Sequence, residues 1–195
     1  LESARSTARF QRHPAQCGTK TMLHIYYGKG KGKTSSALGL ILRASGYNKK
    51  IILFQFLKPK DLFSGEYASL KRFHNVTQIR FNQKHPIFMQ KKGPEQIKKL
   101  KEHIQKSILK LKEIIQKGNF DILVCDEILN LMGEDFVGES KVIKMLIKIK
   151  KEKEIILTGR DKPNKLQKIA DYVTEFRQIR HPFSKGILAR ESIEY

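Results

Sequence analysis

The run from Gly28 to Ser35, with the sequence Gly-Lys-Gly-Lys-Gly-Lys-Thr-Ser, contains the residues whose chemistry is most recognisable. Glycines let a backbone curl so that several N–H groups converge on phosphate oxygens. A helix that follows such a loop adds its unpaired N-terminal amides and the positive end of its dipole. Lys33 could then reach the distal phosphates of a nucleotide, and the Thr34 hydroxyl could ligate Mg²⁺. The run predicts a phosphate-binding loop made of Gly28, Lys29, Gly30, Lys31, Gly32, Lys33, Thr34 and Ser35.

Two features distinguish this loop from the usual pattern. A glycine normally stands five positions before the Gly-Lys pair, and Tyr27 stands there instead, so the loop is effectively one residue tighter. Lys29 and Lys31 also add two cations to Lys33. The alternative interpretation is a flexible basic Gly/Lys linker that touches a nucleic-acid backbone. An apolar strand before the run and an apolar helix after it argue against a linker.

Acidic residues end a second apolar segment, residues 120–127, where Asp126 and Glu127 are its last two residues. At the carboxyl end of a parallel strand, Asp126 could hold Mg²⁺ opposite Thr34. Glu127 would orient or deprotonate a water in an ATPase, or otherwise support the metal or the ribose. The alternative is that both acids only cap the strand. Arg160 ends another predicted strand and could meet a phosphate.

Strands and helices alternate along the predicted chain. Apolar strands are expected at residues 22–27, 50–56, 76–81, 120–127, 154–158 and 172–175, and helices at 37–43, 64–73, from 93 onward, 142–149 and 163–170. This order predicts an α/β fold with three layers, a mostly parallel sheet carrying helices on both faces. Nucleotides bind such sheets at the carboxyl ends of the strands. The long helix from residue 93 should bury the face formed by Ile97, Leu100, Ile104, Ile108, Leu111 and Ile115.

The chain has 195 residues, enough for one domain with a full core. Residues 1–21 are basic and lack apolar periodicity, so we expect a disordered or cloning-derived tail there, with an organellar transit segment as the alternative, and a single domain over residues 22–195. No apolar run is long enough to cross a membrane. Cys17 and Cys125 fit no metal-binding spacing, and an ordinary core thiol at Cys125 agrees with a cytoplasmic location.

The net charge is +20, from 39 Lys and Arg residues against 19 Asp and Glu residues. Such an excess attracts polyanions. Many of the lysines, however, fall on the outward faces of predicted helices, and arginines do not interleave with aromatic residues as in a base-stacking surface. We interpret the charge mostly as solvated surface, and nucleic acid is not an expected partner.

Four stretches of this sequence together resemble the P-loop type of ATP:corrinoid adenosyltransferases. They are residues 28–34 with 37–39 and Arg43; residues 54–58 with 65–66; residues 121–127; and residues 157–160 with 170–175, 181–183 and 186–187. The resemblance covers residues 22–195 and implies a P-loop fold similar to that of RecA-like ATPases. It also implies that the cobalt(I) of a reduced corrinoid attacks the 5′ carbon of ATP and releases triphosphate, with ATP reversed in the loop.

Physical chemistry agrees with this activity. Cobalt(I) is already a powerful nucleophile, so the main barriers are alignment and the charge that develops on the leaving triphosphate. Lys29, Lys31, Lys33 and the loop N–H groups would stabilise that charge together with Mg²⁺ or Mn²⁺, and Asp126 or Glu127 would be the acid linked to the metal. The main rival is a nucleic-acid-stimulated RecA-like ATPase, which would release ADP and phosphate; a small-molecule kinase is a third possibility.

The resemblance assigns further roles by position. Arg43 would lie near the nucleotide. Many family members have a Phe-x-Trp element that helps to displace the lower cobalt ligand, and this chain has no tryptophan. Phe88 would fill part of that role, with core packing as the alternative. The expected partners are ATP and a corrinoid, a flavoprotein reductant and a second copy of the chain in a homodimer.

Overall fold

Six strands form one parallel sheet in the computed structural model, which describes residues 20–59, 63–81 and 93–193. Its strands are β1 (Leu23–Tyr27), β2 (Ile51–Gln55), β3 (Val76–Arg80), β4 (Ile122–Asp126), β5 (Glu154–Gly159) and β6 (Tyr172–Glu175). Their order across the sheet is β3-β2-β4-β5-β1-β6, and every neighbouring pair is parallel. All six strands predicted from the sequence are therefore confirmed. The loop after β1, the acids after β4 and Arg160 after β5 consequently share one edge of the sheet.

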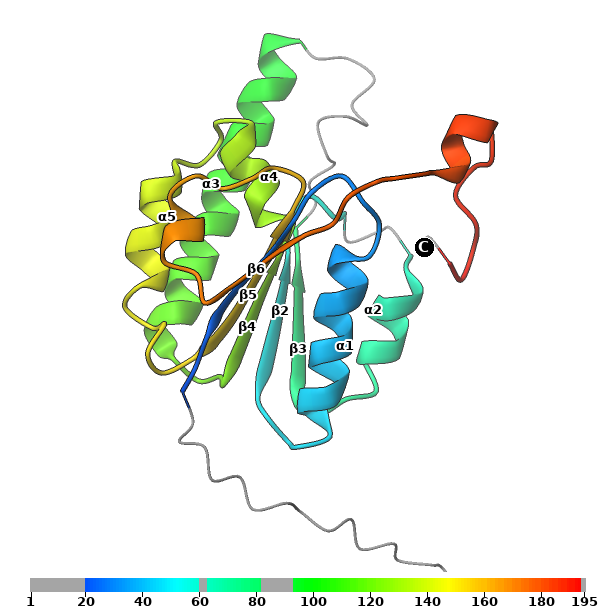
Figure 1. Cartoon of the computed structure of the whole chain (residues 1–195). Coiled ribbons are helices and arrows are strands. Elements are labelled where there is room, and N and C mark those ends of the chain that lie inside the picture. The colour runs from blue at the N-terminus through cyan, green and yellow to red at the C-terminus, as the bar shows by residue number, and fades with distance from the viewer. Residues whose placement is uncertain (1–19, 60–62, 82–92, 194–195) are drawn as a thin grey trace, which may run out of the picture.

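Helices cover both faces of this sheet (Figure 1). One face carries α1 (Lys33–Ser45) and α2 (Gly65–Leu70), and the other carries α3 (Pro94–Lys117), α4 (Ile128–Gly133) and α5 (Glu139–Leu146). Each face has its own cluster of buried side chains, with Ile104 and Leu157 in the larger cluster and Ile41 and Val124 in the smaller. The predicted three-layer α/β architecture is confirmed.

The long helix α3 shows why local signals predicted the elements well. Pro94 lies in its first turn, and Gly118 ends it in the left-handed conformation at φ 62°, both preferred positions for these residues. Most of the predicted apolar face is buried, as at Ile104, which has no exposed surface. Ile97 is an exception with 37% exposure, because the N-terminal end of α3 projects past the sheet (Figure 1).

Two parts of the chain differ from expectation. The helix predicted over residues 163–170 is only the 3₁₀ turn η2 (Leu166–Lys168). The Glu139 carboxylate accepts hydrogen bonds from the amides of Lys165 and Leu166 at 2.6 Å each, and the chain must then return at once to β6. Conversely, α4 follows β4 directly and was not predicted, because its residues Ile128–Leu131 are all buried and show no helical periodicity.

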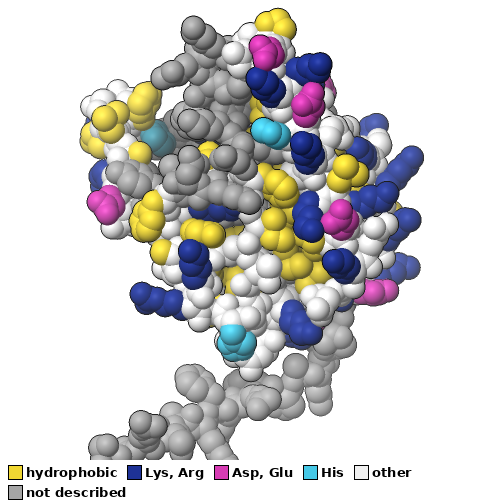
Figure 2. Space-filling view, turned by 180° about the vertical axis from the view of Figure 1, so that it is seen from behind, with side chains coloured by type: hydrophobic (Ala, Val, Ile, Leu, Met, Phe, Trp, Pro, Cys, Tyr) yellow, Lys and Arg dark blue, Asp and Glu magenta, His cyan; other side chains and the backbone are white. Residues whose placement is uncertain are grey.

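The remaining expectations concern the ends and the surface of the molecule. Thr21 is tied to the body through a hydrogen bond from its hydroxyl to the Lys150 carbonyl at 2.8 Å, and a domain boundary at residue 22 stays a prediction. None of the helices in the described ranges combines the length and apolar composition that crossing a lipid bilayer requires. Figure 2 shows Lys and Arg side chains spread over one face of the molecule rather than gathered in one patch.

The packing of α3 yields a matched pair of substitutions. We expect Ile104→Ala to lower the free energy of unfolding by about 2–5 kcal/mol, because it opens a cavity in the core. Ile97→Ala removes the same atoms from a partly exposed position and should cost less than about 1 kcal/mol. Urea denaturation followed by circular dichroism measures both, and equal losses would contradict the described packing of α3.

Candidate functional site: a phosphate-binding loop beside a buried carboxylate

The first two glycines of the loop, Gly28 and Gly30, lie so close to the backbone of residues 176–177 that no side chain would fit. A Cβ atom on Gly28, which has φ 115°, would collide with the carbonyl oxygen of Phe176, and one on Gly30 would lie 2.7 Å from the Arg177 oxygen. The amide of Gly28 donates to the Arg160 carbonyl at 3.1 Å, and that of Gly30 donates to the Phe176 carbonyl at 2.7 Å. These two amides therefore hold the loop against the chain after β5 and the chain after β6, and they do not face a ligand.

The amides suited to a phosphate come later, at the start of α1. Gly32, at φ 117°, turns the chain into the helix. The first amide with an intrahelical acceptor is that of Ser36, which donates to the Gly32 carbonyl at 2.7 Å. The amides of Lys33, Thr34 and Ser35 thus belong to the helical turn that has no acceptor of its own, and this turn lines a cavity. An anion at this position would meet their dipoles.

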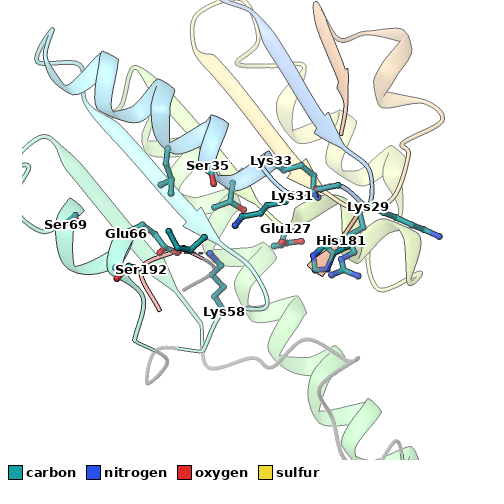
Figure 3. Close-up of a pocket in the computed structure, with 17 residues that line it drawn as sticks. Lys29, Lys31, Lys33, Ser35, Lys58, Glu66, Ser69, Glu127, His181 and Ser192 are labelled. Atoms are coloured by element: carbon teal, nitrogen blue, oxygen red, sulfur yellow. Dashed lines mark hydrogen bonds and ion pairs between the residues drawn. The ribbon is translucent and has the colours of Figure 1, made fainter. Parts of the chain in front are cut away.

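The cavity has a volume of about 730 Å³ and lies between the loop and α2 (Figure 3). The loop residues from Lys29 to Ser35 line it together with Glu127 and Arg160, all of them candidates named from the sequence, whereas Gly28 and Asp126 are not among its lining residues. Arg43 is not among them, because it lies in the last turn of α1 and lines a separate cavity with Tyr47 and Lys49. Phe88 lies outside the described residues. Residues that the sequence analysis gave no role also line the cavity, namely Lys58, Glu66, Ser69, His181 and Ser192.

Asp126 is the centre of the hydrogen-bond network below the loop, and it is fully buried. Its Oδ1 accepts from the hydroxyls of Thr34 at 2.9 Å and Thr158 at 2.6 Å, while Oδ2 accepts from the Gln55 amide at 3.1 Å. The Lys58 ammonium stands 3.5 Å from Oδ2. Burial alone would raise the pKa of Asp126, but the charge of Lys58 and these three hydrogen bonds lower it. The carboxylate is therefore ionised.

A second layer of polar side chains supports this network. The Lys58 ammonium donates to Glu66 at 3.0 Å, and although burial lowers its pKa, the carboxylates of Asp126 and Glu66 raise it overall. Arg80, from the end of β3, donates to the Gln55 side-chain oxygen at 2.8 Å. Gln55, Arg80 and Thr158 are buried polar residues at the carboxyl ends of their strands. A polar residue at the end of an apolar strand is a signal that the sequence contains. The sequence analysis did not use it to assign these three residues to the site.

Glu127 adopts a left-handed backbone conformation at φ 64°, which is unfavourable for a residue with a side chain. Its amide donates to the Thr158 hydroxyl at 3.0 Å, and its carboxylate accepts from the Asn130 amide group at 2.5 Å. Asn130 also accepts from the backbone N–H of Arg160 at 2.5 Å. Burial and the neighbouring Asp126 carboxylate raise the pKa of Glu127. Asn130 thus connects Glu127 and Arg160, the residues that directly follow β4 and β5 at the cavity.

Lys33 folds back onto its own loop. Its ammonium donates to the Gly30 carbonyl at 2.7 Å, and the side chain is almost completely buried. Burial lowers the pKa of Lys33, while the carboxylates of Glu127 and Asp126 act in the opposite direction. A cation held this way is already positioned for an anion that enters the cavity.

Residues 19–195 match the family described as ATP:corrinoid adenosyltransferase BtuR/CobO/CobP. The chain belongs to this family. A corrinoid adenosyltransferase of Sinorhizobium sp is 26% identical over 90% of this chain and 81% of its own length. One of Escherichia coli (strain K12) is 24% identical over 88% of this chain and 84% of its own length. An uncharacterized protein of Nostoc sp. is 31% identical over 85% of this chain, which corresponds to 46% of the Nostoc protein.

Membership of the corrinoid adenosyltransferase family confirms the resemblance inferred from the four sequence stretches. It also confirms that the chain is an enzyme of this type, and it does not favour the nucleic-acid-stimulated ATPase.

Thr158 can be tested because valine has nearly its shape and lacks the hydroxyl. We expect Thr158→Val to lower the free energy of unfolding by about 1–3 kcal/mol, since Asp126 loses a donor and the Glu127 amide loses its acceptor. Thr174→Val, at an exposed position of β6, is the control and should change stability by less than about 0.5 kcal/mol. Chemical denaturation measures both; an equally stable Thr158→Val protein would show that this hydroxyl does not hold the network together.

Proposed function

We propose that this adenosyltransferase-family enzyme moves the 5′-deoxyadenosyl group of ATP to the cobalt(I) of a reduced corrinoid and releases triphosphate. One observation in the site carries the proposal beside the family assignment. Five cationic side chains line the cavity, against the two carboxylates of Glu66 and Glu127; the cations are Lys29, Lys31, Lys33, Lys58 and Arg160. The site therefore offers cations and amides to an anion more readily than it offers a base to a water or hydroxyl. Alkyl transfer to a metal nucleophile needs cations and amides to stabilise the leaving anion, and it needs no general base.

The chemical step follows from the charges around the loop. The electron pair of cobalt(I) forms the new bond to the 5′ carbon, the bond from that carbon to the α-phosphate oxygen breaks, and triphosphate leaves with its electrons. Negative charge therefore grows on the phosphate side. Lys31 and Lys33, the first amides of α1 and Arg160 line the cavity that would receive this charge. Because Lys33 and the amides of α1 are held in place before the reaction, they stabilise the leaving group without reorganisation.

A magnesium ion fits the donor set beside the loop. The Thr34 hydroxyl and the Asp126 carboxylate lie 2.9 Å apart, so one ion can contact both, and Glu127 follows Asp126 directly. Mg²⁺ prefers oxygen ligands and is commonly bound by one or two carboxylates together with phosphate oxygens and water. Among the described residues, no three His, Cys, Asp or Glu side chains form a complete metal site. We assign Thr34, Asp126 and Glu127 to Mg²⁺, or to Mn²⁺, which would neutralise charge on the triphosphate.

The remaining partners are proposals that rest on the family resemblance. A flavoprotein would reduce the corrinoid, the enzyme would act as a homodimer in the cytoplasm, and nucleic acid would have no role. The contribution of Phe88 to the corrinoid side of the reaction stays a prediction.

The decisive experiment is an anaerobic incubation of the protein with ATP, Mg²⁺ and chemically reduced cobalamin. The corrinoid spectrum and the phosphate products are followed together. We expect adenosylcobalamin and triphosphate in equal amounts. An unchanged corrinoid spectrum, with ADP and phosphate released when DNA or RNA is added, would instead identify a nucleic-acid-stimulated ATPase.

Lys33 should be essential for turnover. We expect Lys33→Ala to lower kcat by at least about a hundredfold, because a preorganised charge facing the leaving group is lost. Lys112→Ala removes an exposed lysine from α3 and is the matched control, with unchanged kcat expected. The same anaerobic assay measures both variants, and near-normal turnover by Lys33→Ala would exclude its role in the phosphate cradle.

A further inference from the structure

The side chain of one loop lysine extends away from the centre of the nucleotide cavity. In Figure 3, Lys29 extends to the side opposite Lys58 and Glu66, whereas Lys31 and Lys33 lie near the centre of the cavity. On that outer side the loop borders a second cavity of about 690 Å³. Its walls come from the loop, the turn after β5 and the chain after β6, and they include Tyr27, Lys29, Arg160, Lys162, Phe176 and Arg177.

The second cavity has an unbalanced charge. Four cations line it, and Glu175 is the one acid among its lining residues. Glu175 accepts from the Arg177 guanidinium at 3.0 Å, so it offsets that residue alone. Within the described part of the chain, Lys29, Arg160 and Lys162 form no ion pair. Cations that converge on one cavity repel each other, and a bound anion would relieve that repulsion.

The two cavities are joined through the loop itself. Lys29 and Arg160 line both of them. The hydrogen bonds from Gly28 to the Arg160 carbonyl and from Gly30 to the Phe176 carbonyl fix the wall between them. An anion held on the outer side therefore lies next to the triphosphate site and shares two of its cations.

We propose that this outer cavity is a second anion site that binds a phosphoryl group. Two guanidinium groups and two ammonium groups suit phosphate oxygens, since arginine donates in pairs to such groups and lysine adds a compact charge. Two sources share this chemistry: the triphosphate that leaves the loop, and a phosphodiester carried on the side chain of the corrinoid. The proposal of an anion site does not depend on the proposed adenosyl transfer. The choice between the two sources of the phosphoryl group does rest on that proposed function.

Calorimetric titration of the full chain with sodium triphosphate tests the site without any corrinoid. We expect two classes of site, the tighter one lost in Lys33→Ala. The double variant Lys162→Gln with Arg177→Gln should weaken the other class by about tenfold or more, because two charge-assisted contacts are removed. Lys168→Gln with Arg72→Gln removes the same charges from exposed positions outside both cavities and should change neither class.

A single class of site, or two classes unaffected by the double variant, would overturn the proposal. Because Arg177 packs beside Gly30, thermal unfolding of the variants is compared, and Lys162→Gln alone serves as the second variant. Lys162→Gln should weaken triphosphate binding at the outer cavity by a smaller factor than the double variant does. It should leave triphosphate binding at the loop unchanged.

Turnover distinguishes the two sources. If the outer site receives the leaving triphosphate, added triphosphate should inhibit the double variant more weakly, whichever corrinoid is the acceptor. If it holds the phosphodiester, the KM for cobalamin should rise in the double variant, while the KM for a corrinoid without the nucleotide side chain stays the same. Either change supports a role in the reaction, and the absence of both would overturn that role. A protein that binds triphosphate in two classes but transfers no adenosyl group would refute the proposed function and leave the site intact.

Discussion

The buried carboxylate of Asp126 is the constraint on which the site depends. An ionised group without solvent contact is costly unless charges and hydrogen bonds surround it. Its donors come from four separate segments: Thr34 from α1, Gln55 from β2, Thr158 from β5 and Lys58 from the chain after β2. Because β5 lies between β1 and β4, Thr158 stands between the loop and the acid. The strand order thereby makes the nucleotide loop and the acidic edge one electrostatic unit.

The hydrogen bonds around Asp126 and Thr158 also accompany an unfavourable backbone conformation at the neighbouring Glu127. Glu127 is left-handed, and Gly159, at φ 158°, has no room for a Cβ atom beside Leu129 and Asn130. A left-handed residue with a side chain costs roughly 1–2 kcal/mol. Hydrogen bonds to Thr158 and from Asn130 hold Glu127 in this conformation and aim its carboxylate at the cavity. Strain of this kind is found where a side chain must face a ligand rather than solvent or core.

The features that could be predicted from the sequence are those that depend on residues close together in the chain. Apolar strands, helix-starting Pro94 and the glycine-lysine run carry their own signals, so the fold and the loop could be predicted. The partners of Asp126 could not, because Gln55, Lys58 and Thr158 meet it only once strand order is known. Tertiary structure also explains why the helix over residues 163–170 and the place of Arg43 near the loop were wrongly predicted. Glu139 captures the amides that a helix over 163–170 would have used, and the length of α1 separates Arg43 from the loop.

The net charge of +20 says less about function than the places where charge is left unbalanced. Below the nucleotide loop, the cations Lys58 and Arg80 are matched by the anions Asp126 and Glu66, so this layer is close to neutral. A neutral layer positions groups but does not attract a polyanion. Attraction must come from an excess of cations over acids, and such an excess lines both cavities beside the glycine-rich loop. A loop with two lysines in addition to Lys33 therefore fits a protein that handles phosphate on both sides of that loop.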